Sequence, residues 1–453
     1  MGFSEIPLPP EEIPGCDLPA IQARPPGPQS RTWLLRNSVN VAPMGPRQSL
    51  SPRGKEKPTG IVYSTAKGSN VLDVDGNRYV DLAAGFGALL LGHAHPRILK
   101  VLELQAERLM QALGDVYTSE PRIALCERLA RLYPERAQVI LGQSGADAVS
   151  AALKTAVLAT GKSGVVAFEG SYHGLSYGPL AATSLRESYR QPFAEQLNPA
   201  VRFVPYPASV GLLDLALERV RFELVRGDVG AVLVEPILGR GGVIVPPQGF
   251  LEELKELTQQ HGALLIADEI WTALGRAGDM LVSVARGVTP DLICLGKGLG
   301  GGLPISACIG SVETMAAWRR EHEVVHTATF AGAPLACATA IATLDVLRRD
   351  RLVERAHEVG QAFGARLRAA VEGAAPDCTV RGQGLMWGVE LPQRGNGGAA
   401  VRLMRALLEA GYIVSTGGGT RDVMVLTPSL VIGENQLEAF VAELPLALQA
   451  CGP

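Results

Sequence analysis

The chain has 453 residues, 47% of them hydrophobic and 19% charged, an ordinary globular composition with enough length for a large core and a second, smaller domain. Its formal net charge of −3 provides no overall field to attract nucleic acid or anionic lipid, and no apolar run is long enough to cross a bilayer. The sequence therefore predicts a cytoplasmic protein that acts on small molecules, with neither nucleic acid nor membrane as a partner.

Prolines crowd the first part of the chain. Residues 1–58 are rich in proline and lack periodicity, which predicts an extended N-terminal arm that another subunit would order. Within this arm, Arg31 to Leu35 favour a short helical turn. Residues 70–82 then alternate apolar and polar side chains around Asp75-Gly76, which predicts a hairpin in the smaller domain.

Candidate metal ligands are few. His93 and His95 are separated by one residue, but no acidic or cysteine cluster lies near them, so we expect no metal and assign His95-Pro96 to the start of a helix. The seven cysteines have no paired spacing and lie in apolar settings, which is typical of reduced, packed thiols. Cys294, three residues before Lys297, is interpreted in the same way as part of a strand core.

A strand-to-helix turn near residue 144 has the character of a phosphate site. Residues 138–142 have the pattern of a buried strand, and apolar positions at helical spacing from 146 to 157 predict a helix. The small residues Ser144, Gly145 and Ala146 lie at the start of that helix. Amide donors at a helix start bind phosphate well, so this turn is our candidate phosphate cradle.

Three further strands end in side chains suited to binding a flat, cationic ring. The strands and their end residues are 164–168 with Tyr172, 231–234 with Glu235, and 263–267 with Asp268. Strand-then-helix alternation from 138 to 300 predicts a mostly parallel sheet with helices on both faces, and such sheets place ligands at the strand ends. Asp268 can hold a ring nitrogen by a charge-assisted hydrogen bond, and Tyr172 either stacks on the ring or packs as an ordinary core residue.

One lysine follows a buried strand and precedes a run of glycines. Residues 291–295 are mostly apolar, Lys297 comes next, and the glycines that follow allow a bulky partner to approach the backbone. Apolar flanks lower the pKa of an ammonium, and only the neutral amine attacks a carbonyl to form a Schiff base. A solvated lysine is the alternative. Taken together, Lys297, Asp268 and the phosphate cradle predict pyridoxal phosphate as the cofactor.

Five segments carry a family resemblance. They are Ser144-Gly145-Ala146, Val234-Glu235-Pro236, Ala267-Asp268-Glu269, Gly296 to Pro304 and Thr329 to Pro334. In this order, over roughly residues 70 to 430, they resemble the class III pyridoxal-phosphate aminotransferases. The resemblance implies an α/β chain of fold type I, with a large domain built on a mostly parallel, seven-stranded sheet and a smaller α+β domain from both termini. We place the arm at 1–58, the small domain at 59–85 and 345–453, and the large domain at 86–344.

The resemblance also implies roles for individual residues. Lys297 would form the Schiff base, Asp268 would keep the ring nitrogen protonated, and an amino group would pass from an amine or amino acid to a keto acid by ping-pong chemistry. Tyr172 and Ile270 would cover opposite faces of the ring, with Glu235 near the cofactor. Thr329 would reach the phosphate of a neighbouring subunit, which predicts a homodimer with shared active sites.

The chain departs from the family where the substrate is expected to lie. Val425 occupies the position at which relatives that bind α-carboxylates carry an arginine, and Trp271 replaces a glutamine. Trp271 either lines the pocket or packs, and Phe86 lies in a segment expected near the substrate. Arg240 either meets a substrate carboxylate or pairs with a surface acid. If Arg240 does not bind the carboxylate, an arginine elsewhere does so, or the substrate carries no carboxylate near the reacting amine.

Two other functions are compatible with these departures. Loss of the arginine also fits a racemase or epimerase of amino acids or amino-acid amides on the same fold. A cofactor-free scaffold protein is disfavoured because Lys297 and Asp268 are both present.

Overall fold

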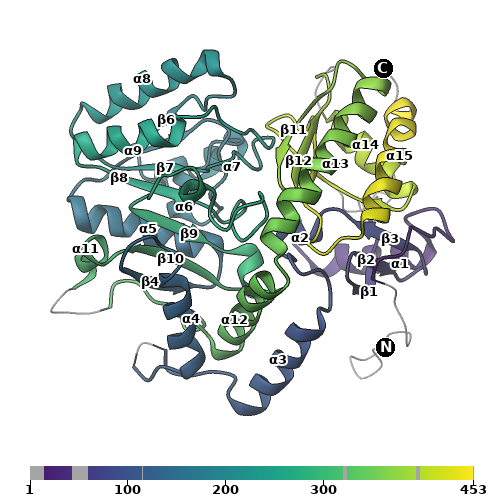
Figure 1. The fold of residues 1–453 in the computed structure, drawn as a ribbon, viewed down its shortest axis with the longest axis horizontal. Coiled ribbons are helices and arrows are strands. Elements are labelled where there is room, and N and C mark those ends of the chain that lie inside the picture. Colours follow the sequence, from purple (N-terminus) through teal and green to yellow (C-terminus); the bar gives the residue numbers. More distant parts are fainter. Residues whose placement is uncertain (1–14, 43–59, 115, 320–323, 394–397, 452–453) are drawn as a thin grey trace.

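The structure is a computed structural model that describes residues 15–42, 60–114, 116–319, 324–393 and 398–451. Residues 1–14 and 43–58 of the predicted arm lie outside the described residues. Figure 1 shows a larger body built from the middle of the sequence beside a smaller body that holds both the earliest and the latest described segments. The predicted fold class, a large α/β domain with a smaller domain from both termini, is confirmed. The exact domain boundaries stay predictions.

The larger body is organised around a seven-stranded sheet with the strand order β4-β10-β9-β8-β7-β5-β6. In chain order its strands are β4 (Ala137–Gly142), β5 (Gly164–Phe168), β6 (Val201–Val204), β7 (Val229–Val234), β8 (Leu264–Asp268), β9 (Leu292–Leu295) and β10 (Ser306–Ser311). β10 is antiparallel to both of its neighbours, and the strands from β9 to β6 are parallel to one another. The carboxyl ends of the parallel strands therefore lie along one edge of the sheet.

Helices cover both faces of this sheet because strand residues point alternately to opposite sides. On β7, Ala231 and Leu233 pack in a core with α5 (Gly145–Thr160), whereas Val232 and Val234 pack in a separate core with α8 (Leu213–Leu224) and α9 (Phe250–His261). Each face is sealed by apolar contacts, so the strands read as continuous hydrophobic runs in the sequence. Gly161, with φ of 70°, ends α5 in the left-handed conformation as its position predicts.

The smaller body contains two four-stranded sheets, β1-β2-β3-β13 and β11-β12-β15-β14. Its strands are β1 (Tyr63–Lys67), β2 (Asn70–Asp73), β3 (Arg78–Asp81), β11 (Thr379–Gln383), β12 (Met386–Glu390), β13 (Tyr412–Ile413), β14 (Ser415–Gly417) and β15 (Val423–Leu426). β2 and β3 form the predicted hairpin around Asp75-Gly76. β13 pairs in parallel with β3, so the C-terminal part of the chain completes the N-terminal sheet.

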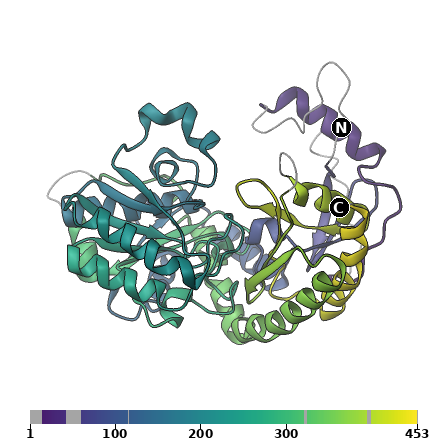
Figure 2. The same ribbon diagram turned by 90° about the horizontal axis from the view of Figure 1, so that it is seen from above.

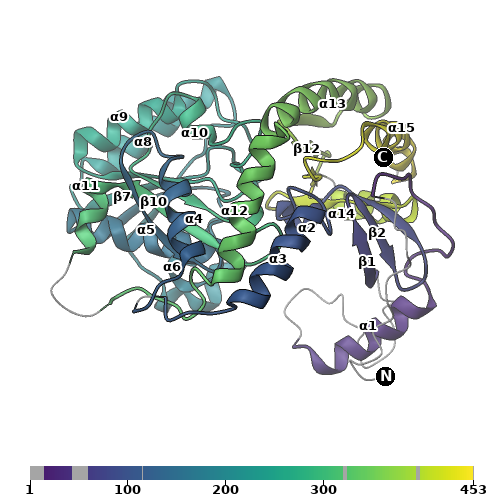
Figure 3. The same ribbon diagram turned by 60° about the horizontal axis from the view of Figure 1, so that its bottom comes forward.

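Long helices join the two bodies. α12 (Pro334–Arg349) leads directly into α13 (Leu352–Ala374), and α3 (Pro96–Arg108) packs against α12 at the junction (Figure 3). His95 caps α3, as expected from His95-Pro96, since its side chain accepts a hydrogen bond from the amide of Arg97. Among the helices in the described segments, none combines the length and the apolar character that a bilayer crossing requires.

The described part of the arm contains a longer helix than the sequence predicted. α1 (Pro28–Asn40) has 13 residues, rather than one turn from Arg31 to Leu35, and it projects away from the smaller body (Figure 2). Its start is fixed from outside the arm: the carboxylate of Asp75 accepts hydrogen bonds from the amides of Gln29 and Ser30 at 2.7 and 2.9 Å. A carboxylate at a helix start satisfies amides that have no partner inside the helix, which explains the extra length.

The remaining elements connect these parts. They are α2 (Ala84–Gly87), α4 (Glu120–Ala130), α6 (Tyr177–Ala181), α7 (Glu187–Arg190), α10 (Val282–Ala285), α11 (Val312–Met315), α14 (Ala399–Glu409), α15 (Glu434–Ala450) and the 3-10 helices Gln191–Gln196, Val210–Leu212, Lys297–Gly300 and Ala316–Trp318.

Candidate active site

Lys297 follows β9 at the carboxyl edge of the large sheet. Its backbone has φ of 43°, a left-handed conformation that costs free energy for any residue other than glycine and is often found at functional sites. Burial disfavours the ammonium form and lowers the pKa of Lys297 to about 8, although the nearby carboxylates of Asp268 and Glu235 act in the opposite direction. The amine nitrogen lies 4.1 Å from the ring centroid of Trp271. A lysine in this setting supplies a neutral amine much more readily than a surface lysine does.

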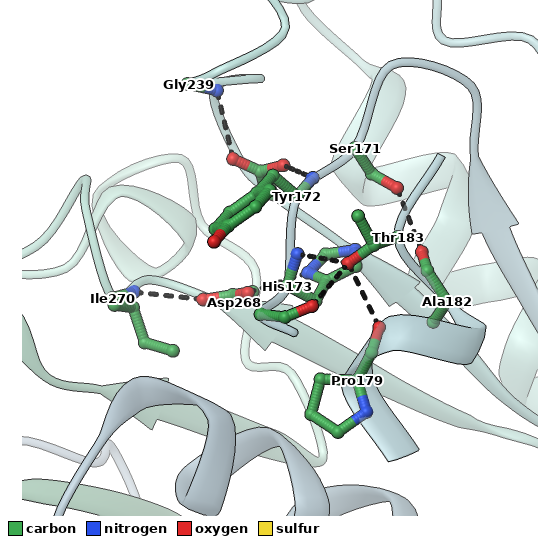
Figure 4. Close-up of polar contacts among 11 residues, drawn as sticks. Ser171, Tyr172, His173, Pro179, Ala182, Thr183, Gly239, Asp268 and Ile270 are labelled. Carbon is green, nitrogen blue, oxygen red and sulfur yellow. Dashed lines mark hydrogen bonds and ion pairs between the residues drawn. The ribbon is translucent and has the colours of Figure 1, made fainter. Parts of the chain in front are cut away.

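Asp268 ends β8, the strand next to β9, and is 5% exposed. Its Oδ2 lies 2.7 Å from Nδ1 of His173, and its Oδ1 accepts a hydrogen bond from the amide of Ile270 at 3.2 Å (Figure 4). The amide of His173 in turn donates to Oγ1 of Thr183 at 3.0 Å. The carboxylate is thus held in a fixed orientation at the mouth of its strand.

Sequence reasoning missed His173 as a functional residue. Its ring is buried against Asp268 through Nδ1, and Nε2 has no hydrogen-bond partner. The only signal in the sequence was its position directly after Tyr172, in the loop that follows β5. The contact itself could not be anticipated, because β7 lies between β5 and β8 in the sheet.

Glu235 joins two loops of the site. Its carboxylate accepts hydrogen bonds from the amide of Tyr172 at 2.9 Å and from the amide of Gly239 at 3.0 Å (Figure 4). Burial is the main cause that raises the pKa of Glu235, and the charge of Asp268 adds to this effect. Glu235 therefore fixes the loop that carries Tyr172 relative to the loop that carries Arg240.

The predicted phosphate cradle is the start of α5. Ser144 caps the helix by accepting a hydrogen bond from the amide of Asp147, whose carboxylate accepts one from the amide of Ser144. The amides of Gly145 and Ala146 come next, at helix positions that have no acceptor within the helix. These two amides, at the positive end of a helix of 16 residues, form a suitable site for an anion.

Ile270 packs against this cradle. A Cβ atom added at Gly145 would lie 2.8 Å from Cδ1 of Ile270, and one added at Gly296 would lie 3.4 Å from its Cγ2. Glycine is therefore required at 145 for the close approach of the Ile270 side chain. The side chain that was predicted to cover one face of a ring thus lies between the cradle and the backbone just before Lys297.

Tyr172 presents its ring to an arginine. The guanidinium carbon of Arg240 lies 4.5 Å from the centroid of the Tyr172 ring, and Tyr189 meets the same ring edge-on at 6.3 Å. The structure therefore brings Arg240 to the loop that carries Tyr172, a contact that the sequence did not reveal. The predicted stacking of Tyr172 on a cofactor ring stays a prediction.

Trp271 and Val425 belong to one apolar cluster that also contains residues of the small domain. Trp271 is 8% exposed and Val425 is 0% exposed. Added Cβ atoms at Gly87 and Gly239 would lie 2.4 Å from the indole of Trp271, so both glycines allow the indole to fit tightly. Of the two alternatives for Trp271, packing and lining the site, the structure supports both, because its ring also faces Lys297.

The other two predicted residues lie at the surface of the chain. Phe86 is 64% exposed, with φ of 58°, in the segment between β3 and α3. Thr329 is exposed on the loop before α12, where its carbonyl accepts a hydrogen bond from the side chain of Gln111 at 2.8 Å. In the part of the chain that the structure describes, no group of three or more His, Cys, Asp or Glu side chains is arranged to hold a metal ion.

These residues suit the cofactor that the sequence predicted. A partly buried amine with a lowered pKa, a carboxylate fixed at a neighbouring strand end and free amides at a helix start lie on the same edge of the sheet. The indole nitrogen of Trp271 is a buried donor with no partner, which leaves one further hydrogen bond to offer.

Comparisons with known proteins agree with this geometry. The family model for aminotransferase class-III matches residues 51–448. The chain is 38% identical over 393 residues to an acetylornithine aminotransferase of Methanopyrus kandleri, a match that covers 86% of this chain and 95% of the relative. The ornithine aminotransferase of Toxoplasma gondii, solved with partial occupancy of pyridoxal phosphate, superimposes with a TM-score of 0.80 at 31% identity and covers 92% of this chain and 94% of its own. A PLP-bound amine transaminase from an uncultivated Pseudomonas species has a TM-score of 0.83 at 28% identity, and the match covers 91% of this chain and 98% of the transaminase.

Proposed function

Because this chain belongs to the class III aminotransferase family, we propose that Lys297 and Asp268 carry out its transamination chemistry with pyridoxal phosphate. The protein is a pyridoxal-phosphate-dependent transaminase. The observation that best supports the proposed roles is the arrangement of the two side chains at the ends of adjacent parallel strands, with the amine shielded from water and the carboxylate held by His173.

The cofactor, when bound, supplies an aldehyde that exchanges with primary amines and a cationic ring that withdraws electrons from the carbon bearing the amine. Lys297 is the residue for covalent attachment, because a pKa near 8 leaves roughly a tenth of its amine neutral at pH 7. After its release, the same amine would act as the base that moves the proton from the reacting carbon of the substrate to the carbon of the former aldehyde. Asp268 provides the anion that retains the proton of the ring nitrogen.

Other residues would hold the cofactor in place. The amides of Gly145 and Ala146 bind its phosphate, with Ser144 completing the cradle. Tyr172 and Ile270 limit access of water to the ring, and the shielding makes the charge on Asp268 more effective.

The test is spectroscopic. Purified protein is expected to show the visible absorption band of a lysine-attached cofactor and to lose it when an amine or amino acid donates its amino group. Lys297→Ala should lose both the band and all turnover, whereas Lys100→Ala, on the exposed surface of α3, should keep both. If Lys297→Ala retains both the band and turnover, Lys297 is not the residue that binds the cofactor covalently.

The comparisons do not favour the racemase alternative, since the relatives are aminotransferases. A direct check is to incubate the enzyme with one enantiomer of an amino acid in deuterium oxide. A transaminase stops after one half-reaction when no keto acid is present, whereas racemisation would continue.

The substrates we propose are an amine or amino acid as donor and a keto acid as acceptor. The relatives' names, acetylornithine and ornithine aminotransferase, support a donor that carries a carboxylate. An apolar, fully buried residue at 425 cannot replace the water around such a group, so the carboxylate has to be bound elsewhere in the site. The cytoplasmic location expected from the sequence stays a prediction.

We further propose a homodimer with shared sites. Met110, Leu113 and Tyr117 are exposed apolar residues of the segment whose Gln111 contacts the loop of Thr329, and Phe330 is exposed on that loop itself. Exposed apolar residues brought together in this way are typical of a protein interface. The bond from Gln111 to the Thr329 carbonyl holds the two loops together. A dimer mass in sedimentation analysis, reduced to a monomer by Leu113→Asp, would support this assembly.

A further inference from the structure

The side chain of Arg240 has no acidic partner. Among the described residues it forms neither a salt bridge nor a side-chain hydrogen bond, and its guanidinium stacks on the ring of Tyr172 at 4.5 Å. It is half-buried. The alternative in which Arg240 pairs with a surface acid is therefore not supported, and its five N–H donors are available to a ligand.

The backbone of Arg240 lies close to Val425, the position at which the family resemblance implies an arginine. The amide of Gly418 donates to the carbonyl of Arg240 at 2.8 Å. A Cβ atom added at Gly417 would lie 2.9 Å from Cγ2 of Val425 and 3.1 Å from the carbonyl oxygen of Arg240. Gly417 alone therefore separates the side chain of Val425 from the backbone of Arg240. An arginine is thus present next to position 425 although that position itself is apolar.

The surroundings of Arg240 are cationic. Arg186 binds the same loop by donating to the carbonyls of Gly419 and Gly418 at 2.8 and 2.9 Å. Burial lowers the pKa of Arg186 most, and the charges of Arg421 and Arg240 lower it further, so both of these guanidinium groups lie within electrostatic reach of Arg186. No salt bridge of Arg186, Arg240 or Arg421 to a carboxylate is present within the described segments. Such a cluster favours an anion.

The residues of the candidate active site lie beside this cluster of arginines. Glu235 holds the amides of both Tyr172 and Gly239, so Arg240 follows directly from a turn that belongs to the cofactor site. Burial is the main cause of the lowered pKa of Lys297, and Arg240 also contributes, so its charge acts on the reacting amine. Trp271 and Val425 belong to an apolar cluster whose members carry no charge, and the indole nitrogen of Trp271 is a neutral donor, so this cluster offers a carboxylate no charged partner.

Another arginine near the site is less suitable. Arg276 is 1% exposed, and its Nη1 donates to the carbonyls of Leu385 and Pro428. It is enclosed by protein and connects the two domains, so a substrate has no access to it. Of the arginines that influence Lys297, Arg240 and Arg276, only Arg240 is both accessible and unpaired.

We propose that Arg240 binds the carboxylate of the substrate and so determines that this transaminase accepts carboxylate-bearing amines and keto acids from the Tyr172 side of its site. This inference rests on the proposed function. The planar guanidinium forms two parallel hydrogen bonds with a carboxylate, and Tyr172 holds it in a fixed plane by stacking. The apolar surface of the Trp271 ring is then left for the side chain of the substrate.

The experiment compares two donors of nearly the same shape, L-alanine and isopropylamine, in which a methyl group replaces the carboxylate. Arg240→Gln should lower kcat/KM for alanine roughly ten- to hundredfold, because a hydrogen bond to a charged group is lost, and should change the value for isopropylamine far less. Arg240→Lys keeps the positive charge but loses the two parallel N–H donors of the guanidinium, so its kcat/KM for alanine should lie between those of the wild type and Arg240→Gln. Arg368→Gln is the matched control, because Arg368 stacks on Trp387 at 4.8 Å on the exposed face of α13.

A binding measurement makes the test independent of turnover. Isobutyrate has the shape of alanine with a methyl group in place of the amine, and it cannot react. Titration calorimetry of the holoenzyme should show roughly ten- to hundredfold weaker isobutyrate binding for Arg240→Gln and no change for Arg368→Gln. Equal losses for alanine and isopropylamine, or unchanged isobutyrate binding, would overturn the proposal. A wild-type enzyme that converts neither donor would instead refute the proposed function, and the isobutyrate result would still decide the role of Arg240.

Discussion

Replacing Lys297 by methionine is expected to abolish function and yet stabilise the protein without its cofactor. The ammonium of Lys297 is held where burial opposes charge, and its pKa falls from 10.5 to about 8. One pKa unit corresponds to about 1.4 kcal/mol, so the ammonium form costs at most about 3 kcal/mol in the folded state. We lower this to about 1–3 kcal/mol because the side chain is partly exposed. Methionine has a similar length and no charge.

The dependence on pH follows from the direction of the shift. Because the pKa of Lys297 is lower in the folded than in the unfolded state, the unfolded chain holds more protons between pH 8 and 10.5. The contribution of Lys297 to the free energy of unfolding of the wild-type protein therefore rises with pH between pH 8 and 10.5. The advantage of Lys297→Met should be largest below pH 8 and should shrink as the pH approaches 10.5. Tyrosine and cysteine titrations are common to both proteins and cancel in the difference.

The assay is urea denaturation of both proteins after removal of the cofactor, at pH 7 and pH 10. Lys100→Met is the control, because Lys100 is exposed on α3 and its replacement should change the free energy of unfolding by less than about 0.5 kcal/mol. If Lys297→Met is no more stable than the wild type at pH 7, or if its advantage does not shrink at pH 10, burial does not disfavour the ammonium form of Lys297. Our account of the reactivity of this lysine would then be wrong.

Two further predictions concern the support of the site. His173→Ala removes the partner of Asp268 Oδ2 at 2.7 Å, and we expect roughly ten- to hundredfold weaker cofactor retention, measured by equilibrium dialysis; unchanged retention would show that His173 does not hold the carboxylate. Gly145→Ala places a methyl group 2.8 Å from Cδ1 of Ile270 and should cost about 1 kcal/mol in thermal unfolding, whereas the same change made in an Ile270→Ala background should cost much less; no loss in the wild-type background would mean that the cradle tolerates a side chain at this position.

Much of the site was predictable because its parts are local. A buried strand that ends in a polar residue can be recognised from a few neighbours, and in a parallel sheet the strand ends meet at one edge whatever the details of packing. This is why Asp268 and Lys297, 29 residues apart, were both identified and lie at the ends of β8 and β9. The start of α5 was recognised for the same reason, since Ser144 and the residues after it define a helix start within one turn.

The longer N-terminal helix was not predicted, because its first amides are satisfied by Asp75, a residue of the hairpin turn that lies 45 or more positions away. Intrinsic preference alone gives a short turn at this place, and a contact from the body of the protein extends it. Contacts of this type depend on the folded arrangement and leave no periodicity in the sequence.

The sequence by itself determined the fold class, the lysine, the carboxylate and the phosphate cradle, because each depends on a pattern along a single segment. Only the tertiary structure decided that His173 reaches Asp268 across an intervening strand, and that Arg240 stacks on Tyr172 beside Val425. The physical reason is that these contacts join loops from different strands and from both domains. The strand order and the packing of glycines at 239 and 417 set the distances between those loops, and neither can be read from neighbouring residues.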